Sequence, residues 1–181
     1  MIILENLEVL ELLGPFDQEL DFLARYVDGC HHAKEELALF PALSSRGLGK
    51  DALLEEALEQ HEEARRLISK MRENRSRDVA SRYVELIKSH VEMEDSVTFA
   101  VAEYSLPDYE KEEILSRMRE LSTKRCAGFE DAARHLLARL QGTYRYGPAI
   151  ARGSRVRLWL ARSIRGTARR HVLLKCAVPH L

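Results

Sequence analysis

The chain has 181 residues, of which 45% are hydrophobic and 31% charged, and this is enough for one domain with a hydrophobic core. All 29 Asp and Glu residues lie within residues 1–131, whereas residues 132–181 carry 11 of the 28 Lys and Arg residues and no acidic residue. This split indicates an acidic body with a basic tail, and no stretch reaches the ~20 apolar residues that span a membrane.

Apolar residues recur with a helical period up to about residue 140, and no strand is predicted there. Glycine, proline and polar breaks divide this region into five helices. In chain order we expect a short stub at about 2–12, a long helix at 17–43, and further helices at 51–73, 78–105 and 109–140. The composition changes after GTYRYGP, so we predict an all-α helical bundle over 1–142 and a basic C-terminal tail over 143–181.

The helix at 17–43 carries polar residues on an otherwise apolar face, in the stretch CHHAKEELALFPAL. His31 and Glu35 lie on the stripe that is apolar along its whole length, one turn apart. His32 and Glu36 lie on the neighbouring stripe, which begins with polar residues. We therefore expect His31 and Glu35 to point inward and His32 to turn toward the rim of the bundle.

The next two helices repeat this pattern. His61 lies in the middle of the apolar stripe at 51–73, and His90 and Glu94 lie one turn apart on the stripe at 78–105. A single histidine on an apolar face is more often a satisfied core residue than a ligand, but three such coincidences on three helices favour a metal site. Imidazole and carboxylate together suit iron, manganese or zinc, and a carboxylate can bridge two ions in a bundle core.

In these segments the sequence resembles the hemerythrin-like, or HHE cation-binding, domain family over about residues 15–140. HHAKEELALFPAL is similar to the family's HHxKEE…LFP signature, EQHEEAR to its EHE segment, and SHVEMEDSVTFAVAEYSL to its H-x-x-x-E/D segment. The resemblance implies a four-helix bundle that holds non-haem iron, used to bind or sense dioxygen or to handle iron. No nucleophile–base pair or phosphate-binding loop is visible in the sequence, so we do not expect an enzyme. The implied metal ligands are His31, Glu35, His61, His90 and Glu94, with His32 and Glu36 as additional candidates.

Two departures from the family pattern concern the ligand count. The family's first helix normally carries a histidine, but residues 1–29 contain none, and Ala57 stands where classical oxygen carriers have another. We therefore expect less than full di-iron occupancy. An open side at the stub favours either a homodimer through that face or cover by the tail. Two alternatives remain open. The first is di-iron redox chemistry on peroxide or nitric oxide, or iron delivery for cluster repair. The second is a structural bundle without a metal.

The remaining features predict little chemistry. Cys30, Cys126 and Cys176 are odd in number and widely spaced, which favours reduced thiols and a cytoplasmic protein. The acidic start MIILENLEVLELLGP is not typical of a signal peptide. The tail has a basic amphipathic pattern around Trp159, but Gly166 and the lack of acidic residues favour an extension without a nucleic-acid or membrane partner.

Overall fold

A computed structural model describes residues 7, 10–11, 14–48 and 53–129, and every regular element in this part of the chain is helical. In chain order these are α2 (Asp17–Phe22), η1 (Leu23–His32), η2 (Glu35–Leu39), α3 (Phe40–Ser45), α4 (Leu53–Asn74), α5 (Arg77–Met93), η3 (Glu94–Thr98), α6 (Phe99–Ser105), α7 (Asp108–Leu121) and η4 (Ser122–Cys126), where η marks a π-helical segment. The all-α prediction is confirmed, and no described helix is long and apolar enough to cross a membrane.

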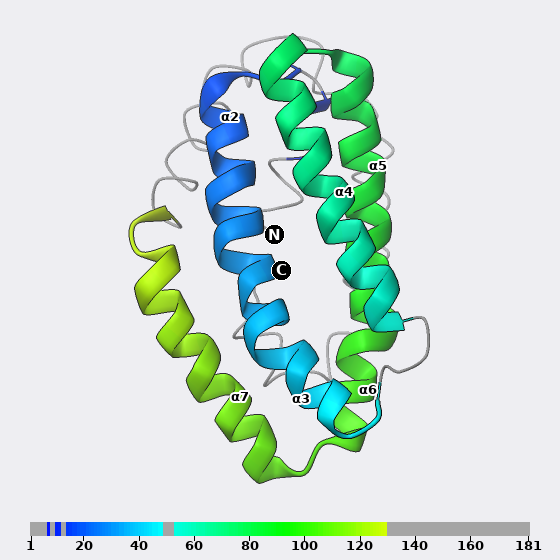
Figure 1. Cartoon of the computed structure of the whole chain (residues 1–181), viewed down its shortest axis with the longest axis vertical. Coiled ribbons are helices and arrows are strands. Elements are labelled where there is room, and N and C mark those ends of the chain that lie inside the picture. Colours follow the sequence, from blue (N-terminus) through cyan, green and yellow to red (C-terminus); the bar gives the residue numbers. More distant parts are fainter. Residues whose placement is uncertain (1–6, 8–9, 12–13, 49–52, 130–181) are drawn as a thin grey trace, which may run out of the picture.

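The elements join into four long rods, residues 17–45, 53–74, 77–105 and 108–126, which run side by side (Figure 1). The first three rods begin and end within about two residues of the predicted helices. The turn before α5 is fixed by Ser76, whose hydroxyl caps the helix by accepting a hydrogen bond from the Val79 N–H. The predicted helix at 109–140 begins as expected but ends early, at Cys126, because Ala127 leaves the helical region with a ψ of 121° and Gly128 follows with a φ of 81°. Residues 130–140 lie outside the described residues, as do most of the stub and the whole tail.

Two separate hydrophobic cores fill the bundle. The upper core packs α2, η1, α4 and α5 together through the buried residues Leu20, Leu23, Tyr26, Val27, Leu67, Ile68, Met71, Tyr83, Val84 and Ile87. The lower core packs η2, α3, α6 and α7 through Leu39, Phe40, Leu43, Phe99, Ala102, Ile114, Leu115 and Met118. A layer of buried polar side chains lies between the two cores, at the height where the predicted metal residues occur.

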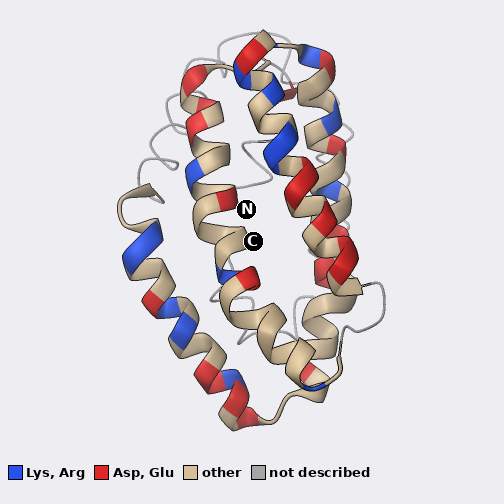
Figure 2. Ribbon diagram, in the orientation of Figure 1, with Lys and Arg blue, Asp and Glu red and all other residues tan. Residues whose placement is uncertain are grey.

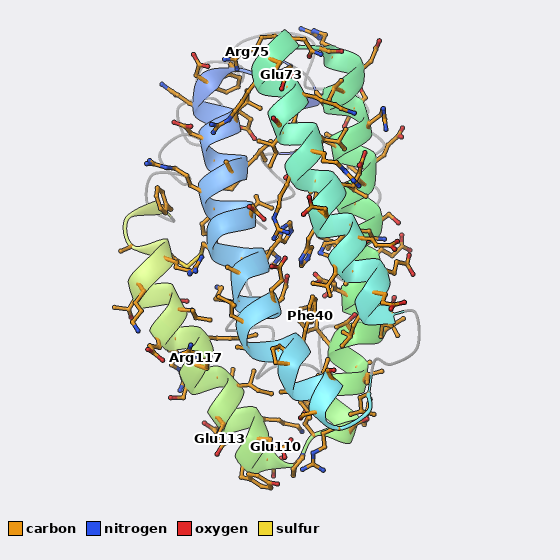
Figure 3. The ribbon with its side chains drawn as sticks, in the orientation of Figure 1. Phe40, Glu73, Arg75, Glu110, Glu113 and Arg117 are labelled. Atoms are coloured by element: carbon orange, nitrogen blue, oxygen red, sulfur yellow. A yellow bond between two sulfur atoms is a disulfide. The ribbon has the colours of Figure 1, made fainter. Side chains whose placement is uncertain are left out.

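Charged residues lie mainly on the outside of the rods. Figure 2 shows both signs interspersed along α7. Its Glu113 and Arg117 are exposed, and Figure 3 labels both on this rod. The outer faces of the described helices are therefore solvated.

The prediction of reduced cysteines is wrong for two of the three. Cys30 in η1 and Cys126 in η4 form a disulfide, with their Cα atoms 5.2 Å apart and a sequence separation of 96. Wide spacing along the chain did not predict this bond because the two residues meet only when η4 packs beside η1. The third cysteine, Cys176, lies outside the described residues.

Candidate metal centre

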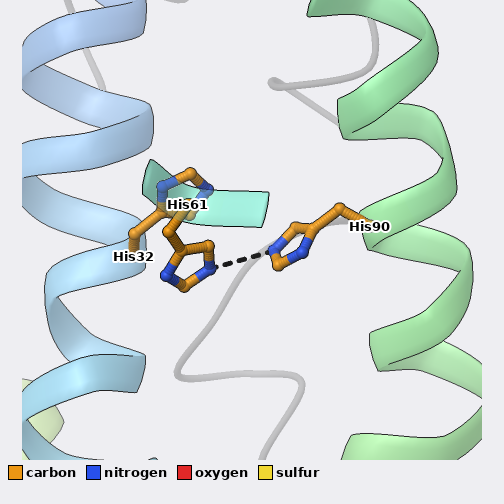
Figure 4. Close-up of side chains that lie close together, drawn as sticks. All are labelled: His32, His61 and His90. Carbon is orange, nitrogen blue, oxygen red and sulfur yellow. Dashed lines mark hydrogen bonds between the residues drawn. The ribbon is translucent and has the colours of Figure 1, made fainter. Parts of the chain in front are cut away.

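Buried imidazoles and carboxylates from three rods converge in the polar layer. Two groups of side chains have donor atoms that all lie within 4.8 Å of one another. One is formed by Glu35, His61, His90 and Glu94, and the other by His32, His61 and His90. All five side chains are at most 1% exposed. Figure 4 shows the three histidine rings facing one another across the space between the rods.

The two histidines that both groups share are in direct contact. His61 Nε2 lies 3.1 Å from His90 Nε2. A carboxylate stands beside each of these nitrogens: Glu35 Oε2 is 3.5 Å from His61 Nε2, and Glu94 Oε1 is 3.3 Å from His90 Nε2. The His32 ring stacks on the His61 ring with the centroids 3.8 Å apart. Two Nε2 atoms and two carboxylates therefore face one small volume.

The outward nitrogen of each ring contacts an oxygen atom of another side chain. His61 Nδ1 is 2.8 Å from Glu36 Oε1, and His90 Nδ1 is 2.8 Å from Gln60 Oε1. His32 Nδ1 is 3.6 Å from Asp28 Oδ1. The two 2.8 Å contacts fix the orientation and the tautomer of His61 and His90, because an Nδ1–H that donates outward leaves Nε2 with its lone pair pointing inward. The His32 contact is too long for a hydrogen bond.

Burial sets the charge state of the centre. It lowers the pKa of His32 to about 3, and it lowers the pKa of His61 although Glu36 opposes the effect. Burial, together with the nearby charge of Glu94, raises the pKa of Glu35 well above its usual value. His32 and His61 are therefore neutral at pH 7, which is the form that binds metals, while Glu35 and Glu94 resist being charged together.

These contacts fit a cation better than a metal-free core. With Nδ1 of His61 and His90 donating outward, their Nε2 atoms would oppose two lone pairs at 3.1 Å, which is repulsive unless a cation lies between them. The same cation would neutralise Glu35 and Glu94, whose burial as charged groups is otherwise costly. Neutral imidazole and carboxylate oxygen are also the donor types that iron, manganese and zinc accept.

The structure differs from the expected arrangement at three residues. His32 does not turn to the rim: it is 1% exposed and joins the centre. His31 is also buried, but it belongs to neither group of donors and contacts the centre through Glu35 Oε1, 3.4 Å from its Nε2. Glu36 belongs to neither group and lies behind His61, with its side chain 25% exposed.

The π-helical segments explain why the inward face of the first rod differs from the predicted one. His31 and His32 end η1, Glu35 begins η2, and Glu94 begins η3. A π-helix bonds residue i to i+5, so more residues fit in one turn than the 3.6 assumed from the sequence. This winding brings His31 and His32 into the interior together.

The sequence did not predict the roles of Gln60 and Asp28. Asp28 precedes His32 by one turn on the same polar stripe, which is a usable signal.

Comparison with known proteins adds a family match. The family model described as "Hemerythrin HHE cation binding domain" matches residues 3–102, more than half of the chain. The match covers every residue of the two donor groups and ends within α6, so that α7 and η4 lie beyond it. No curated protein and no solved structure matches the chain.

Proposed function

Because the chain belongs to the hemerythrin HHE cation-binding domain family, we propose that it binds non-haem iron in the polar layer and uses it to bind or sense dioxygen or to handle iron. Catalytic turnover is not proposed as its main role. The observation that carries the proposal is the convergence of Glu35, His61, His90 and Glu94, all buried, with their donor atoms within 4.8 Å of one another.

The resemblance to the family favours iron, and the donor set is compatible with it. Carboxylates and imidazoles on facing helices are how bundle proteins hold non-haem iron. Bound iron would supply a redox couple and an open coordination position for a small ligand such as dioxygen. The chain's own part is to hold the neutral imidazoles inward and to exclude water, because the Phe40 ring lies 5.8 Å from the His61 ring and is itself buried (Figure 3).

The two donor groups support an iron content below two ions per chain. They share His61 and His90, and each of these rings has its Nδ1 engaged by an oxygen acceptor. Each shared ring therefore offers one nitrogen, Nε2, to the centre. The groups thus describe two ways of holding one ion, through Glu35 and Glu94 or through His32.

The test is iron content with an optical spectrum. The purified protein would be loaded anaerobically with Fe²⁺, desalted, analysed for iron, and examined spectroscopically before and after exposure to air. We expect about one iron per chain, a new absorption band after air, and at least a tenfold loss of iron affinity in His61→Ala and in His90→Ala.

A histidine outside the donor groups provides the control. His135→Ala should keep the wild-type iron content, since this residue lies beyond the segments that resemble the family's metal-binding motifs. An equal loss in all three variants, or a folded wild-type protein that takes up no iron, would overturn the proposal.

A further inference from the structure

A single arginine connects two of the oxygen acceptors behind the histidine rings. Arg65 on α4 donates from Nε to Asp28 Oδ1 on η1 at 2.7 Å, and from Nη2 to Glu36 Oε1 on η2. The guanidinium therefore spans two π-helical segments of the first rod. The side chains of the three residues are 25–34% exposed, so that the cluster lies at the border between the centre and solvent.

The oxygen atoms that Arg65 holds are the same ones that contact the rings. Glu36 Oε1 lies 2.8 Å from His61 Nδ1, and Asp28 Oδ1 lies 3.6 Å from His32 Nδ1. A partly exposed carboxylate has several rotamers that would leave the ring without an acceptor. The planar, forked guanidinium fixes both carboxylates at once, which the single ammonium group of a lysine does not do.

We propose that Arg65 is a positioning residue of the metal centre, which holds Glu36 so that His61 presents Nε2 to the bound cation and also keeps Asp28 beside the His32 ring. This inference rests on the proposed function. Arg65 acts through the carboxylates and contacts no donor atom of the centre. Its contribution differs from that of an ordinary surface ion pair, because its loss alters the ligands of the cation as well as the packing of α4 on η1.

The neighbouring residue provides a matched control. Arg66 is also on α4 and also pairs with a carboxylate, Glu63 at 2.8 Å, but it is 58% exposed and its partner contacts no histidine of the centre. Arg66→Met therefore removes the same charge and one ion pair from the same helix. Arg65→Lys keeps the charge of Arg65 and removes only the forked geometry.

The experiment uses the full-length chain. It measures the ligand-field bands of bound Co²⁺ and the affinities for Co²⁺ and Fe²⁺. We expect Arg65→Met to weaken Co²⁺ and Fe²⁺ binding by about 10- to 100-fold and to shift the Co²⁺ ligand-field bands. Arg65→Lys should recover only part of the affinity, and Arg66→Met should stay within about twofold of wild type. Circular dichroism of the metal-free proteins checks that each variant is folded.

A double variant decides whether Arg65 works through Glu36. If it does, Arg65→Met in a Glu36→Gln background should cost much less affinity than it does in wild type. Equal binding by Arg65→Met and Arg66→Met, or losses that simply multiply in the double variant, would overturn the inference and leave the proposed function intact. A folded wild-type protein that binds neither Co²⁺ nor Fe²⁺ would overturn both.

Discussion

The carboxyl group of Glu19 gives the bundle a pH-dependent stability that is separate from the metal centre. Glu19 lies on α2 and is fully buried, and neither of its carboxylate oxygens has a hydrogen-bond partner among the described residues. Burial raises its pKa to about 8 from an ordinary value of 4.5. The buried hydroxyl of Tyr83 likewise has no hydrogen-bond partner there, and burial followed by the charge of Glu19 raises the pKa of Tyr83.

The direction of the effect follows from the protons bound in each state. Above pH 4.5 the unfolded chain loses the Glu19 proton, whereas the folded chain keeps it until about pH 8. The contribution of Glu19 to the free energy of unfolding is therefore complete below pH 4.5 and falls as the pH rises toward 8. With these two pKa values, the linkage relation gives a loss of roughly 3 to 4 kcal/mol between pH 5 and 8.

The assay compares wild type with Glu19→Gln, because other buried groups such as His32 also titrate on unfolding. Urea unfolding of the metal-free proteins at pH 5, 6, 7 and 8 gives the free energy of unfolding of each. The free energy of unfolding of Glu19→Gln should rise relative to that of wild type by roughly 3 to 4 kcal/mol from pH 5 to 8. Glu85→Gln changes an exposed residue, so its free energy of unfolding should follow that of wild type at every pH. Parallel curves for wild type and Glu19→Gln would refute the buried neutral carboxyl.

Two further predictions concern the disulfide and the paired carboxylates. Reduction of the Cys30–Cys126 bond, or Cys126→Ser, should lower the urea-derived free energy of unfolding by up to about 4.7 kcal/mol, since the bond closes a loop of nearly a hundred residues; an unchanged midpoint in reductant would contradict this. Glu94→Gln should stabilise the metal-free protein, because it removes the charge that opposes Glu35, and should weaken Fe²⁺ binding by at least about tenfold. If Glu94→Gln instead lowers both the stability of the metal-free protein and its Fe²⁺ affinity, Glu94 is only a packing residue.

The sequence predicted the rods well because periodicity and helix-end signals are local. Pro107 ends one helix, and the apolar stripe around His61 identified the face of α4 that is buried. The centre was predicted less completely, because the sequence was read with 3.6 residues per turn. At His32 the π-helical winding changes which side chains face inward, and the 3.6-residue period of apolar residues does not indicate this winding.

The other differences are tertiary in origin. Glu36 has the residue type of a ligand, but whether it reaches the cation or the back of His61 depends on where Arg65 lies across the bundle. Cys30 and Cys126 are paired by the packing of η4 on η1, which spacing along the chain does not reveal. Such contacts join residues far apart in sequence, so they follow from the fold and are not visible beforehand.

The division of the bundle into two cores has a consequence for the cooperativity of folding. Each rod that carries a donor group contributes apolar residues to the upper core on one side of the polar layer and to the lower core on the other. Without a cation, the contacts between the halves run through buried carboxylates and imidazoles that gain little from meeting. A bound cation would make that layer a cross-link between the three rods that carry donor residues. Metal occupancy would then decide whether the domain behaves as one cooperative unit, or as two halves that exchange their amide hydrogens independently.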